Sequence, residues 1–276
     1  MGFCCVALLV VQLSFFDTVV EMRKQHFDVV YMRHCPISPK GIRMMRRIAE
    51  AGSQLVVEIP SFPLENEGKR NVLRRLYWAY SQHCWKRAAK YVTRFVVIGG
   101  PADSYLGRPA MNIDNGVDVE AIPLRQHEPA ADGKIHFLAL ATMARWHGFD
   151  RLIQGVARMS PELRRQLVVD MVGSDGDGSL PRWQQLVEEL GMRDRVRFLG
   201  FRNDLPNVYP AADVFVFPSF FEGMPNTVIE AQATGLPCVI ADTITPEADI
   251  TGLVKYLPLG ASEKWAEAAL ASLREE

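Results

Sequence analysis

Two glutamates eight positions apart, Glu222 and Glu230, lie in the segment FPSFFEGMPNTVIEAQATGLPCVIADT (217–243). Ionised carboxylates are strong acceptors for vicinal hydroxyl groups. Gly223 and Met224 follow the first glutamate, and just before a helix their backbone N–H groups would be placed to donate to an anion. The segment therefore combines acceptors for hydroxyls with donors for an anion. In the structural alternative, Glu222 only caps a helix and Glu230 lies on its solvated face.

A strand, a turn, a helix and a second strand must position these groups. The apolar residues 214–217 predict a buried strand, and Pro225 predicts the first residue of a helix because its fixed φ and missing N–H suit that place. Gly235 can end the helix, and residues 237–241 predict the next buried strand. This is a βαβ unit, and ligands of open α/β sheets lie at the carboxyl ends of the strands.

Two series of short apolar strands alternate with helical segments along the chain, which predicts parallel, doubly wound sheets of the α/β class. The first series comprises residues 27–32, 55–60 and 95–99, with helices over 38–51 and 69–90. The second series comprises residues 135–141, 167–173, 196–200, 214–219 and 237–242. The polar stretch 125–134 is the predicted linker, so we expect domains over 1–124 and 125–276.

The composition sets limits on partners and compartment. A formal net charge of -1 implies no general attraction to nucleic acid. The five cysteines show no paired CxxC spacing, so neither a zinc site nor a disulfide framework is indicated and a reducing cytoplasm is expected.

The first sixteen residues, MGFCCVALLVVQLSFF, are apolar. They are short for a membrane span and lack the basic region of a signal peptide, so we predict a core helix of the first domain. The abrupt opening also indicates a chain that begins in the middle of a fold.

A basic and aromatic stretch, residues 69–94, contains Lys and Arg but no Asp or Glu, interleaved with Tyr77, Trp78, Tyr80 and Trp85. On a helix this combination suits an anionic membrane surface, where a lipid-linked acceptor would be found. Alternatively, the aromatic residues pack into the core of the first domain and the cations are simply solvated.

Four motifs in order resemble the retaining, nucleotide-sugar-dependent glycosyltransferases of family 4 (group 1), whose GT-B fold has two Rossmann-like domains. Glu222 to Glu230 resembles the E-x7-E signature of that family. The other three are MNIDNGVDVEAIPL (111–124), similar to the interdomain N-G-[IV]-D segment, WHGFDRLIQG (146–155), similar to K-G-x-x-x-L-I, and MRDRVRFLGF (192–201), similar to d-r-V-x-F-x-G. YMRHCPISPKG (31–41), EIPSFPLENE (58–67) and DTITPEADIT (242–251) resemble the capsular and exopolysaccharide branch.

The resemblance implies a role for each carboxylate. Glu222 would contact the hydroxyls of the donor sugar and Glu230 the ribose hydroxyls, while the N–H groups of Gly223 and Met224 and the helix dipole would stabilise the diphosphate. The implied catalytic residues are Glu222 and Glu58. The implied donor-binding residues are Arg145, His147, Gly148, Phe201, Arg202, Glu222, Gly223, Met224, Pro225, Asn226 and Glu230.

The chain departs from the family where two cations are expected. Many members place an Arg and, five residues on, a Lys directly before the Gly of K-G, and here those positions hold Thr142 and His147. Arg145, His147 and Arg151 lie close enough in sequence to substitute, and a phosphate neighbour would favour a protonated imidazole. The alternative is that these are surface residues at a strand-to-helix turn.

Two further groups of polar residues follow predicted strands. Glu58, Ser61 and Glu65 lie in EIPSFPLENE, at the carboxyl end of the strand 55–60, and by resemblance first-domain residues there face the donor sugar; a polar loop is the alternative. Asp175 and Asp177 form a D-x-D within GSDGDG but lack further ligands at a calcium-loop spacing, which favours a glycine-rich turn. The resemblance implies no metal and no other cofactor.

The leading hypothesis is a cytoplasmic enzyme, possibly at the inner face of the cell membrane, that moves a sugar from a nucleoside diphosphate sugar to a polysaccharide or lipid-linked acceptor with retention. By resemblance, the mechanism would be front-face displacement, with no protein nucleophile. The first domain lacks the opening strand and Gly-rich loop of the family, so we expect it to be incomplete. The alternatives are a catalytically silent or truncated nucleotide-sugar-binding remnant, and a related phosphorylase or epimerase. Base, sugar, acceptor and linkage stay open.

Overall fold

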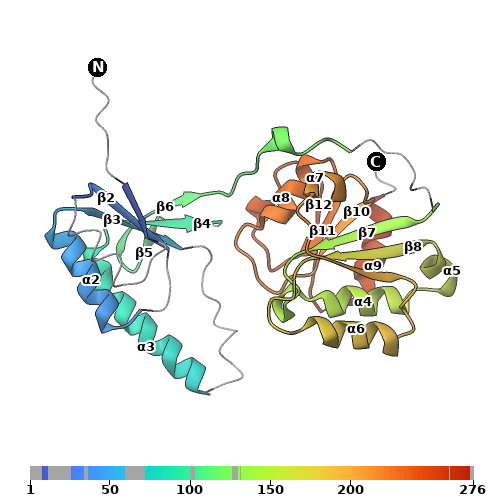
Figure 1. The fold of residues 1–276 in the computed structure, drawn as a ribbon, viewed down its shortest axis with the longest axis horizontal. Coiled ribbons are helices and arrows are strands. Elements are labelled where there is room, and N and C mark those ends of the chain that lie inside the picture. The colour runs from blue at the N-terminus through green and yellow to red at the C-terminus, as the bar shows by residue number, and fades with distance from the viewer. Residues whose placement is uncertain are drawn as a thin grey trace. The chain divides into compact units, whose positions relative to one another are not determined.

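The computed structural model describes residues 8–11, 26–33, 37–59, 72–99, 103–125, 130, 132–260 and 262–273. The chain forms two compact units, Met1–Asp114 and Asn115–Glu276, and each has its own sheet of mainly parallel strands (Figure 1). Residues 115–124, which the sequence assigns to the first domain, belong to the second unit by their contacts. Asn115 hydrogen-bonds to Met224, and Arg125 N donates to Thr234 O at 2.8 Å.

The first unit has a six-stranded sheet in the order β1-β2-β3-β4-β6-β5. Its strands are β1 (Leu8–Val11), β2 (Val29–Arg33), β3 (Gln54–Ile59), β4 (Arg94–Ile98), β5 (Ser104–Tyr105) and β6 (Arg108–Ile113). Its helices are α2 (Pro39–Glu50), α3 (Val72–Ala88) and the short 3-10 turn η2 (Ala89–Tyr91). Neighbouring strands are parallel except β5 and β6, which form an antiparallel hairpin. The five elements expected over 27–99 are confirmed, whereas the hairpin was not expected.

The prediction of a core helix over residues 1–16 is wrong for Leu8–Val11. These residues form β1, and Leu8 pairs in parallel with Val29 of β2. A short, wholly apolar run is compatible with a buried strand or a buried helix, and only the pairing with the neighbouring strand distinguishes them. The rest of the segment lies outside the described residues.

The core of the first unit lies between the sheet and its helices. Apolar side chains from β3, including Leu55 and Val57, are fully buried, as is Met45 of α2. Trp85 of α3 is also fully buried and contacts Phe95 of β4 edge to face, with ring centroids 6.4 Å apart. This confirms the core alternative for Trp85.

The second unit has a wholly parallel six-stranded sheet in the order β12-β11-β10-β7-β8-β9. Its strands are β7 (Ile135–Leu140), β8 (Leu167–Val172), β9 (Val196–Gly200), β10 (Val214–Phe217), β11 (Cys238–Ala241) and β12 (Val254–Leu257). Its helices are α4 (Phe149–Arg158), α5 (Pro161–Arg165), α6 (Leu180–Glu189), α7 (Leu205–Val208), α8 (Asn226–Ala233) and α9 (Ser262–Ser272), with 3-10 turns η3 (Val119–Ala121), η4 (Arg145–His147) and η5 (Pro246–Ala248). All five strands expected here are confirmed, and β12 is an addition.

The strand order fixes where a ligand can bind in the second unit. β7 lies between β8, which follows it in the chain, and β10, which comes much later, so the order reverses between β7 and β10. At such a switch point the loops after the two strands separate, and ligands of open α/β sheets bind there. The four central strands β7, β8, β10 and β11 are almost entirely buried, as expected for a sheet covered on both faces, whereas the edge strands β9 and β12 are partly exposed.

Candidate functional site

Two loops meet at the switch point, residues 141–148 after β7 and residues 218–225 after β10. The carbonyl oxygen of Trp146 in the first loop accepts a hydrogen bond from Phe220 N at 2.7 Å. The hydroxyl of the fully buried Ser219 also lies 3.2 Å from the same oxygen. The two loops are therefore joined through the backbone, beside the segment that carries Glu222.

Gly148 allows this close approach. Its φ is +64°, in the left-handed region, and a Cβ at this position would lie 2.2 Å from the carbonyl oxygen of Pro218. Any other residue would clash with the backbone of the second loop. The glycine expected at the donor site thus has a structural task, since it lets α4 begin directly against the loop after β10.

Glu222 is half-buried and lies next to His147. Its Oε1 is 3.2 Å from Nδ1 of His147 and 3.3 Å from Oγ of Ser219. The distance to Nδ1 is that of an ion pair, although the Nδ1 atom makes no well-aligned hydrogen bond with the described residues. The sequence assigned both residues to the donor site, but it gave no sign that they touch.

His147 is buried among aromatic rings rather than lying at the surface. Its ring centroid is 5.5 Å from that of Trp146, 6.1 Å from that of Phe149 and 5.7 Å from that of Phe217. Only 8% of the residue is exposed. The alternative that His147 is a surface residue at a turn is therefore wrong.

Glu230 lies on α8 and has a partner of its own. Its Oε2 accepts a hydrogen bond of 2.5 Å from the hydroxyl of Tyr209, which is fully buried. Burial, together with this bond and the carboxylate charge, raises the pKa of Tyr209. Glu230 is half-buried, so the alternative of a freely solvated side chain does not describe it.

The helix α8 begins at Asn226, one residue later than predicted. Pro225 is the N-cap of the helix: its backbone is extended (φ -74°, ψ 120°), and its carbonyl oxygen accepts a hydrogen bond from Val228 N. Gly235, with φ +77°, follows the end of the helix as predicted. Within the described part of the chain, no acceptor receives a hydrogen bond from the backbone N–H of Gly223 or Met224.

Asn115 holds the turn before α8 and is a residue whose position the sequence did not indicate. Its Nδ2 donates to the carbonyl oxygen of Met224 at 2.6 Å, and its backbone N lies 3.2 Å from the sulfur of the same residue. Asn115 is the Asn of the N-G-[IV]-D segment, and that motif was the available signal. The bond keeps the backbone of Gly223 and Met224 in place beside the start of the helix.

The residues considered as substitute cations differ in availability. The side chain of Arg145 is exposed, and its backbone N donates to Asp177 at 3.3 Å. Arg151 instead donates to the carbonyl oxygen of Leu259 and lies 4.5 Å above the ring centroid of Phe220. The guanidinium of Arg151 is thus already engaged by Leu259 and Phe220, whereas Arg145 faces solvent on the loop after β7.

The D-x-D segment forms a turn. Oδ1 of Asp175 accepts from the backbone N–H of Gly178 at 2.9 Å and of Ser179 at 3.1 Å, just before α6. These bonds match the glycine-rich turn favoured by the sequence. Across the described residues, no group of three or more His, Cys, Asp or Glu gathers closely enough to hold a metal ion.

Phe201 and Arg202 follow β9. Phe201 is 73% exposed, which leaves its ring open to a flat partner. Arg202 forms a two-point ion pair with Asp204, with N–O distances of 2.7 and 2.5 Å, and this pairing lowers the pKa of Asp204 to about 2. The guanidinium of Arg202 is therefore already neutralised.

Glu58 lies within β3 of the first unit, not in the loop after it. Its Oε2 accepts from the hydroxyl of Tyr31 at 2.8 Å, and its Oε1 lies 3.4 Å from Nε of Arg33. Burial and then the carboxylate raise the pKa of Tyr31 to about 12. Glu58 thus lies near the carboxyl end of β3, which extends to Ile59, whereas Ser61 and Glu65 lie outside the described residues.

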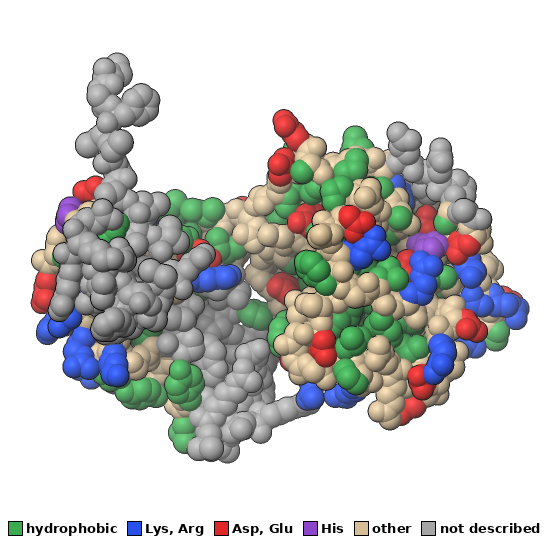
Figure 2. All heavy atoms as spheres, in the orientation of Figure 1, with side chains coloured by type: hydrophobic (Ala, Val, Ile, Leu, Met, Phe, Trp, Pro, Cys, Tyr) green, Lys and Arg blue, Asp and Glu red, His purple; other side chains and the backbone are tan. Residues whose placement is uncertain are grey.

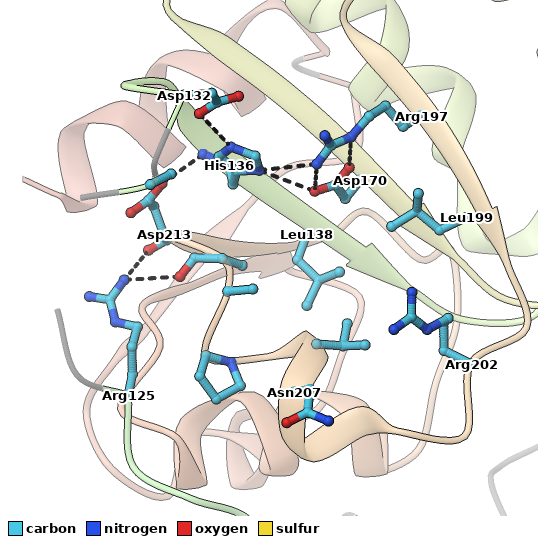
Figure 3. Close-up of a pocket in the computed structure, with 15 residues that line it drawn as sticks. Arg125, Asp132, His136, Leu138, Asp170, Arg197, Leu199, Arg202, Asn207 and Asp213 are labelled. Atoms are coloured by element: carbon cyan, nitrogen blue, oxygen red, sulfur yellow. Dashed lines mark hydrogen bonds and ion pairs between the residues drawn. The ribbon is translucent and has the colours of Figure 1, made fainter. Parts of the chain in front are cut away.

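A second cluster of charged side chains lines a cavity of about 540 Å³ in the second unit, which Arg202 also lines (Figure 3). His136, at the start of β7, has Nε2 3.1 Å from Asp132 and Nδ1 3.2 Å from Asp170. Arg197 forms a two-point ion pair with Asp170, at 2.5 and 2.6 Å. These groups neutralise one another, and neither Glu222 nor Glu230 lines this cavity. The sequence did not single out any of them.

The basic and aromatic helix α3 has one side chain packed in the core and others exposed, so neither the core nor the membrane interpretation covers all of its residues. Trp85 is in the core, whereas Leu76, Tyr77 and Tyr80 are exposed. The following Lys86, Arg87 and Lys90 are exposed too, and the side chain of Trp78 is outside the described residues. A search of the described helices finds none that is long and apolar enough to cross a bilayer.

Comparison with known proteins places this geometry in a family. Residues 134–275 match the model of the glycosyl transferases group 1 family. The chain is 50% identical over 54 residues to a UDP-Gal:alpha-D-GlcNAc-diphosphoundecaprenol alpha-1,3-galactosyltransferase of Escherichia coli (20% of this chain, 14% of that protein). It is 34% identical over 167 residues to a putative glycosyltransferase EpsF of Bacillus subtilis (56% and 42%). The chain thus spans less than half the length of these curated relatives.

Solved structures of low sequence identity share the fold. Anabaena Alr3699/HepE in complex with UDP aligns with a TM-score of 0.70 and 19% identity over 95% of this chain and 72% of that one. Sucrose-phosphate synthase from Thermosynechococcus elongatus aligns with a TM-score of 0.72 and 17% identity over 95% and 68%. These likenesses confirm the expected α/β, GT-B-like fold. With more than half of its residues matched by the family model, the chain belongs to the group 1 glycosyl transferases.

Proposed function

We propose that this protein is a retaining glycosyltransferase of family 4 that transfers a sugar from a nucleoside diphosphate sugar to a polysaccharide or lipid-linked acceptor. The observation that carries the proposal is the position of the two carboxylates. Glu222 follows β10 and Glu230 lies on the next helix, at the switch point of a parallel sheet in a group 1 chain. The capsular or exopolysaccharide branch is part of the proposal.

Each carboxylate is assigned one part of the donor. Glu222 accepts hydrogen bonds from hydroxyls of the sugar, and Glu230 accepts from the ribose hydroxyls. The free N–H groups of Gly223 and Met224 and the start of α8, formed by Pro225 and Asn226, stabilise the charge of the leaving diphosphate.

The loops after β7 and β9 complete the donor site. Arg145 supplies an exposed positive charge, and His147 and Gly148 build the loop against which Glu222 lies. Phe201 offers an exposed ring to the base, with Arg202 beside it. The assignment of Glu58 of the first unit as a catalytic residue is part of the proposal. No metal or other cofactor takes part, since the protein groups and the helix dipole act on the diphosphate.

The reaction is a front-face displacement in which the leaving diphosphate helps to deprotonate the acceptor hydroxyl. An Escherichia coli relative whose name specifies a diphosphoundecaprenol acceptor supports a lipid-linked acceptor. The structure of Anabaena Alr3699/HepE in complex with UDP supports a uridine donor as the first to test.

Binding and turnover are measured separately. Thermal shift is recorded with UDP, GDP, ADP and their glucose conjugates, because a ligand that binds only the folded state raises the melting temperature. Transfer and donor hydrolysis are then assayed with the donor that binds. Stabilisation by one nucleotide family together with turnover supports the enzyme, and the absence of any stabilisation contradicts a donor site.

A catalytically silent nucleotide-sugar-binding remnant is the second candidate. The observation that favours it is the replacement of the two expected cations by Thr142 and His147. Without these two cations, the negative charge of the departing diphosphate is stabilised less. Binding without turnover of any sugar nucleotide in the panel supports this candidate. A phosphorylase or an epimerase is distinguished by its products, because an epimerase needs no acceptor.

The first unit is proposed to contact the anionic cytoplasmic face of the cell membrane through α3. The exposed side chains of α3 and the following η2 combine an apolar and aromatic group (Leu76, Tyr77, Tyr80) with a basic group (Lys86, Arg87, Lys90). Basic residues attract anionic headgroups, and aromatic rings suit the interface. Part of this unit and of its exposed charges is visible in Figure 2.

Co-sedimentation with phosphatidylglycerol vesicles tests the contact. Changing Lys86, Arg87 and Lys90 together to Glu is expected to abolish sedimentation. The same reversal at the exposed Arg43, Arg46 and Arg47 of α2 is the matched control. Equal losses in both variants indicate attraction by net charge alone, and binding to neutral phosphatidylcholine vesicles contradicts an electrostatic contact.

A further inference from the structure

We infer that His147 is a positioning residue for Glu222: it holds the carboxylate that binds the donor sugar, and it acts on the donor through that carboxylate. This inference rests on the proposed function, because it concerns the sugar-binding half of the same site. It differs from a direct contact between His147 and the diphosphate.

The first step of the argument is that the imidazole has a fixed position. It is enclosed by Trp146, Phe149 and Phe217, with ring centroids 5.5 to 6.1 Å away. The next residue, Gly148, lies against the carbonyl of Pro218 so closely that a Cβ would clash. The ring therefore cannot follow a moving partner, and a partner bound to it is held in turn.

The second step concerns the carboxylate. Glu222 lies on a loop before α8, where a side chain has several rotamers to choose from. The contacts recorded for its carboxylate in the described structure are with Nδ1 of His147, at 3.2 Å, and with the hydroxyl of Ser219, at 3.3 Å. That hydroxyl has one proton and lies equally near the carbonyl oxygens of Trp146 and Phe221. The hydroxyl is thus shared among three acceptors, whereas Nδ1 of His147 has Glu222 as its neighbour in the described structure.

The third step concerns charge. Among the residues that the structure describes, His147 is the one basic side chain within ion-pairing distance of Glu222. An imidazole can donate from Nδ1 in its protonated form or in one neutral tautomer, so either form can face an ionised carboxylate. The ionised form is the one that accepts hydrogen bonds from sugar hydroxyls.

The experiment separates the sugar from the nucleotide. Calorimetry gives the Kd of UDP and of UDP-glucose, or of GDP or ADP and their glucose conjugates if the thermal-shift panel selects one of these. The ratio of the two Kd values measures what the sugar adds. In the His147→Ala variant we expect this ratio to fall by a few-fold, because Glu222 loses the neighbour that fixes its position, with the Kd of the bare nucleotide unchanged.

A matched control is available in the same unit. His136 is likewise 8% exposed and is paired with carboxylates, but it belongs to the separate cluster of Figure 3. His136→Ala is expected to lower the melting temperature and to leave the sugar ratio unchanged. If both variants lower the ratio alike, the effect is general destabilisation and the inference is overturned.

A double variant tests whether His147 acts on the donor sugar through the carboxylate of Glu222. Glu222→Gln alone should lower the sugar ratio, and adding His147→Ala should lower it no further. His147→Gln, which keeps an N–H donor, should retain more of the ratio than His147→Ala. Losses that simply add, or equal weakening of bare nucleotide and sugar nucleotide, assign His147 to the diphosphate and overturn the inference. If no nucleotide binds the unaltered protein, the proposed function fails and this inference fails with it.

Discussion

The hydroxyl of Tyr209 donates a hydrogen bond of 2.5 Å to Oε2 of Glu230, so the carboxylate assigned to the ribose is held from inside the core. Tyr209 is fully buried and its ring centroid lies 6.2 Å from that of Phe215 in β10. The position of Glu230 is thus set by the sheet below it as well as by α8. The first prediction follows from this bond.

Tyr209→Phe removes the bond and keeps the ring. We expect a loss of about 1 kcal/mol in the free energy of unfolding, since Glu230 is half-buried and water can replace part of the bond. Nucleotide affinity should fall by a few-fold, because the carboxylate is no longer fixed. Urea unfolding and calorimetry measure the two effects. Tyr256→Phe also removes a hydroxyl that lies near backbone carbonyls, and it should change stability without changing affinity. Unchanged nucleotide affinity in Tyr209→Phe would contradict the positioning role.

Glu230→Ala tests the ribose contact itself. One hydrogen bond from a hydroxyl to a charged group contributes about 1.5 to 3 kcal/mol, so nucleotide binding should weaken about tenfold or more. Calorimetric titration with the bare nucleoside diphosphate measures it. Glu189→Ala, at an exposed glutamate of α6, is the matched control and should bind as the unaltered protein does. Equal affinity of both variants would remove Glu230 from the site.

Gly148→Ala should be among the most destabilising single changes in the second unit. The added Cβ would lie 2.2 Å from Pro218 O, and the backbone of an alanine would be strained at φ +64°. We expect a loss of about 3 kcal/mol or more in unfolding free energy, together with loss of nucleotide binding. Gly191 has nearly the same φ, +65°, and open space around its Cβ position, so Gly191→Ala should cost only about 1 kcal/mol. Chemical denaturation compares them, and similar costs would show that the close approach of the loops is not required.

The ion pair between Arg202 and Asp204 predicts a pH effect whose sign can be worked out. The pKa of Asp204 is lowered from 3.8 to about 2 in the folded protein. A carboxyl with a lowered folded pKa contributes stability above its unfolded pKa, and this contribution is lost as the pH falls from about 4 towards 2. Arg202→Ala should return the pKa of Asp204 towards 3.8, as followed by NMR titration of the side-chain carboxyl. A pKa that stays near 2 in the variant would show that backbone donors, and not the guanidinium, set it.

The sequence predicted the buried strands and the βαβ unit well, because their signals are local. Gly235 after the helix and Pro225 before it could be placed to within a residue. The hairpin of β5 and β6 was missed because its turn uses Leu106 at φ 49° before Gly107 at φ 72°. Such turns usually carry Asn or Asp before the glycine, and a leucine there gives no warning.

Contacts between distant residues were beyond reach for a different reason. The pairing of His147 with Glu222 and of Asn115 with Met224 joins loops that are far apart in the chain and meet only when the sheet forms. A single sequence gives residue types for both partners but not their distance. The motifs therefore indicated candidate residues for a donor site, whereas the contacts of these residues are visible only in the fold.

The carbonyl oxygen of Trp146, which accepts from the backbone of the loop after β10, has a practical consequence for redesign. A chimera that exchanges only one of the two loops with a relative would have to re-form this joint, with Gly148 pressed against a foreign backbone. A chimera that exchanges residues 141–148 and 218–225 together keeps the joint intact. Altered donor preference is therefore best sought by transplanting both loops as one module.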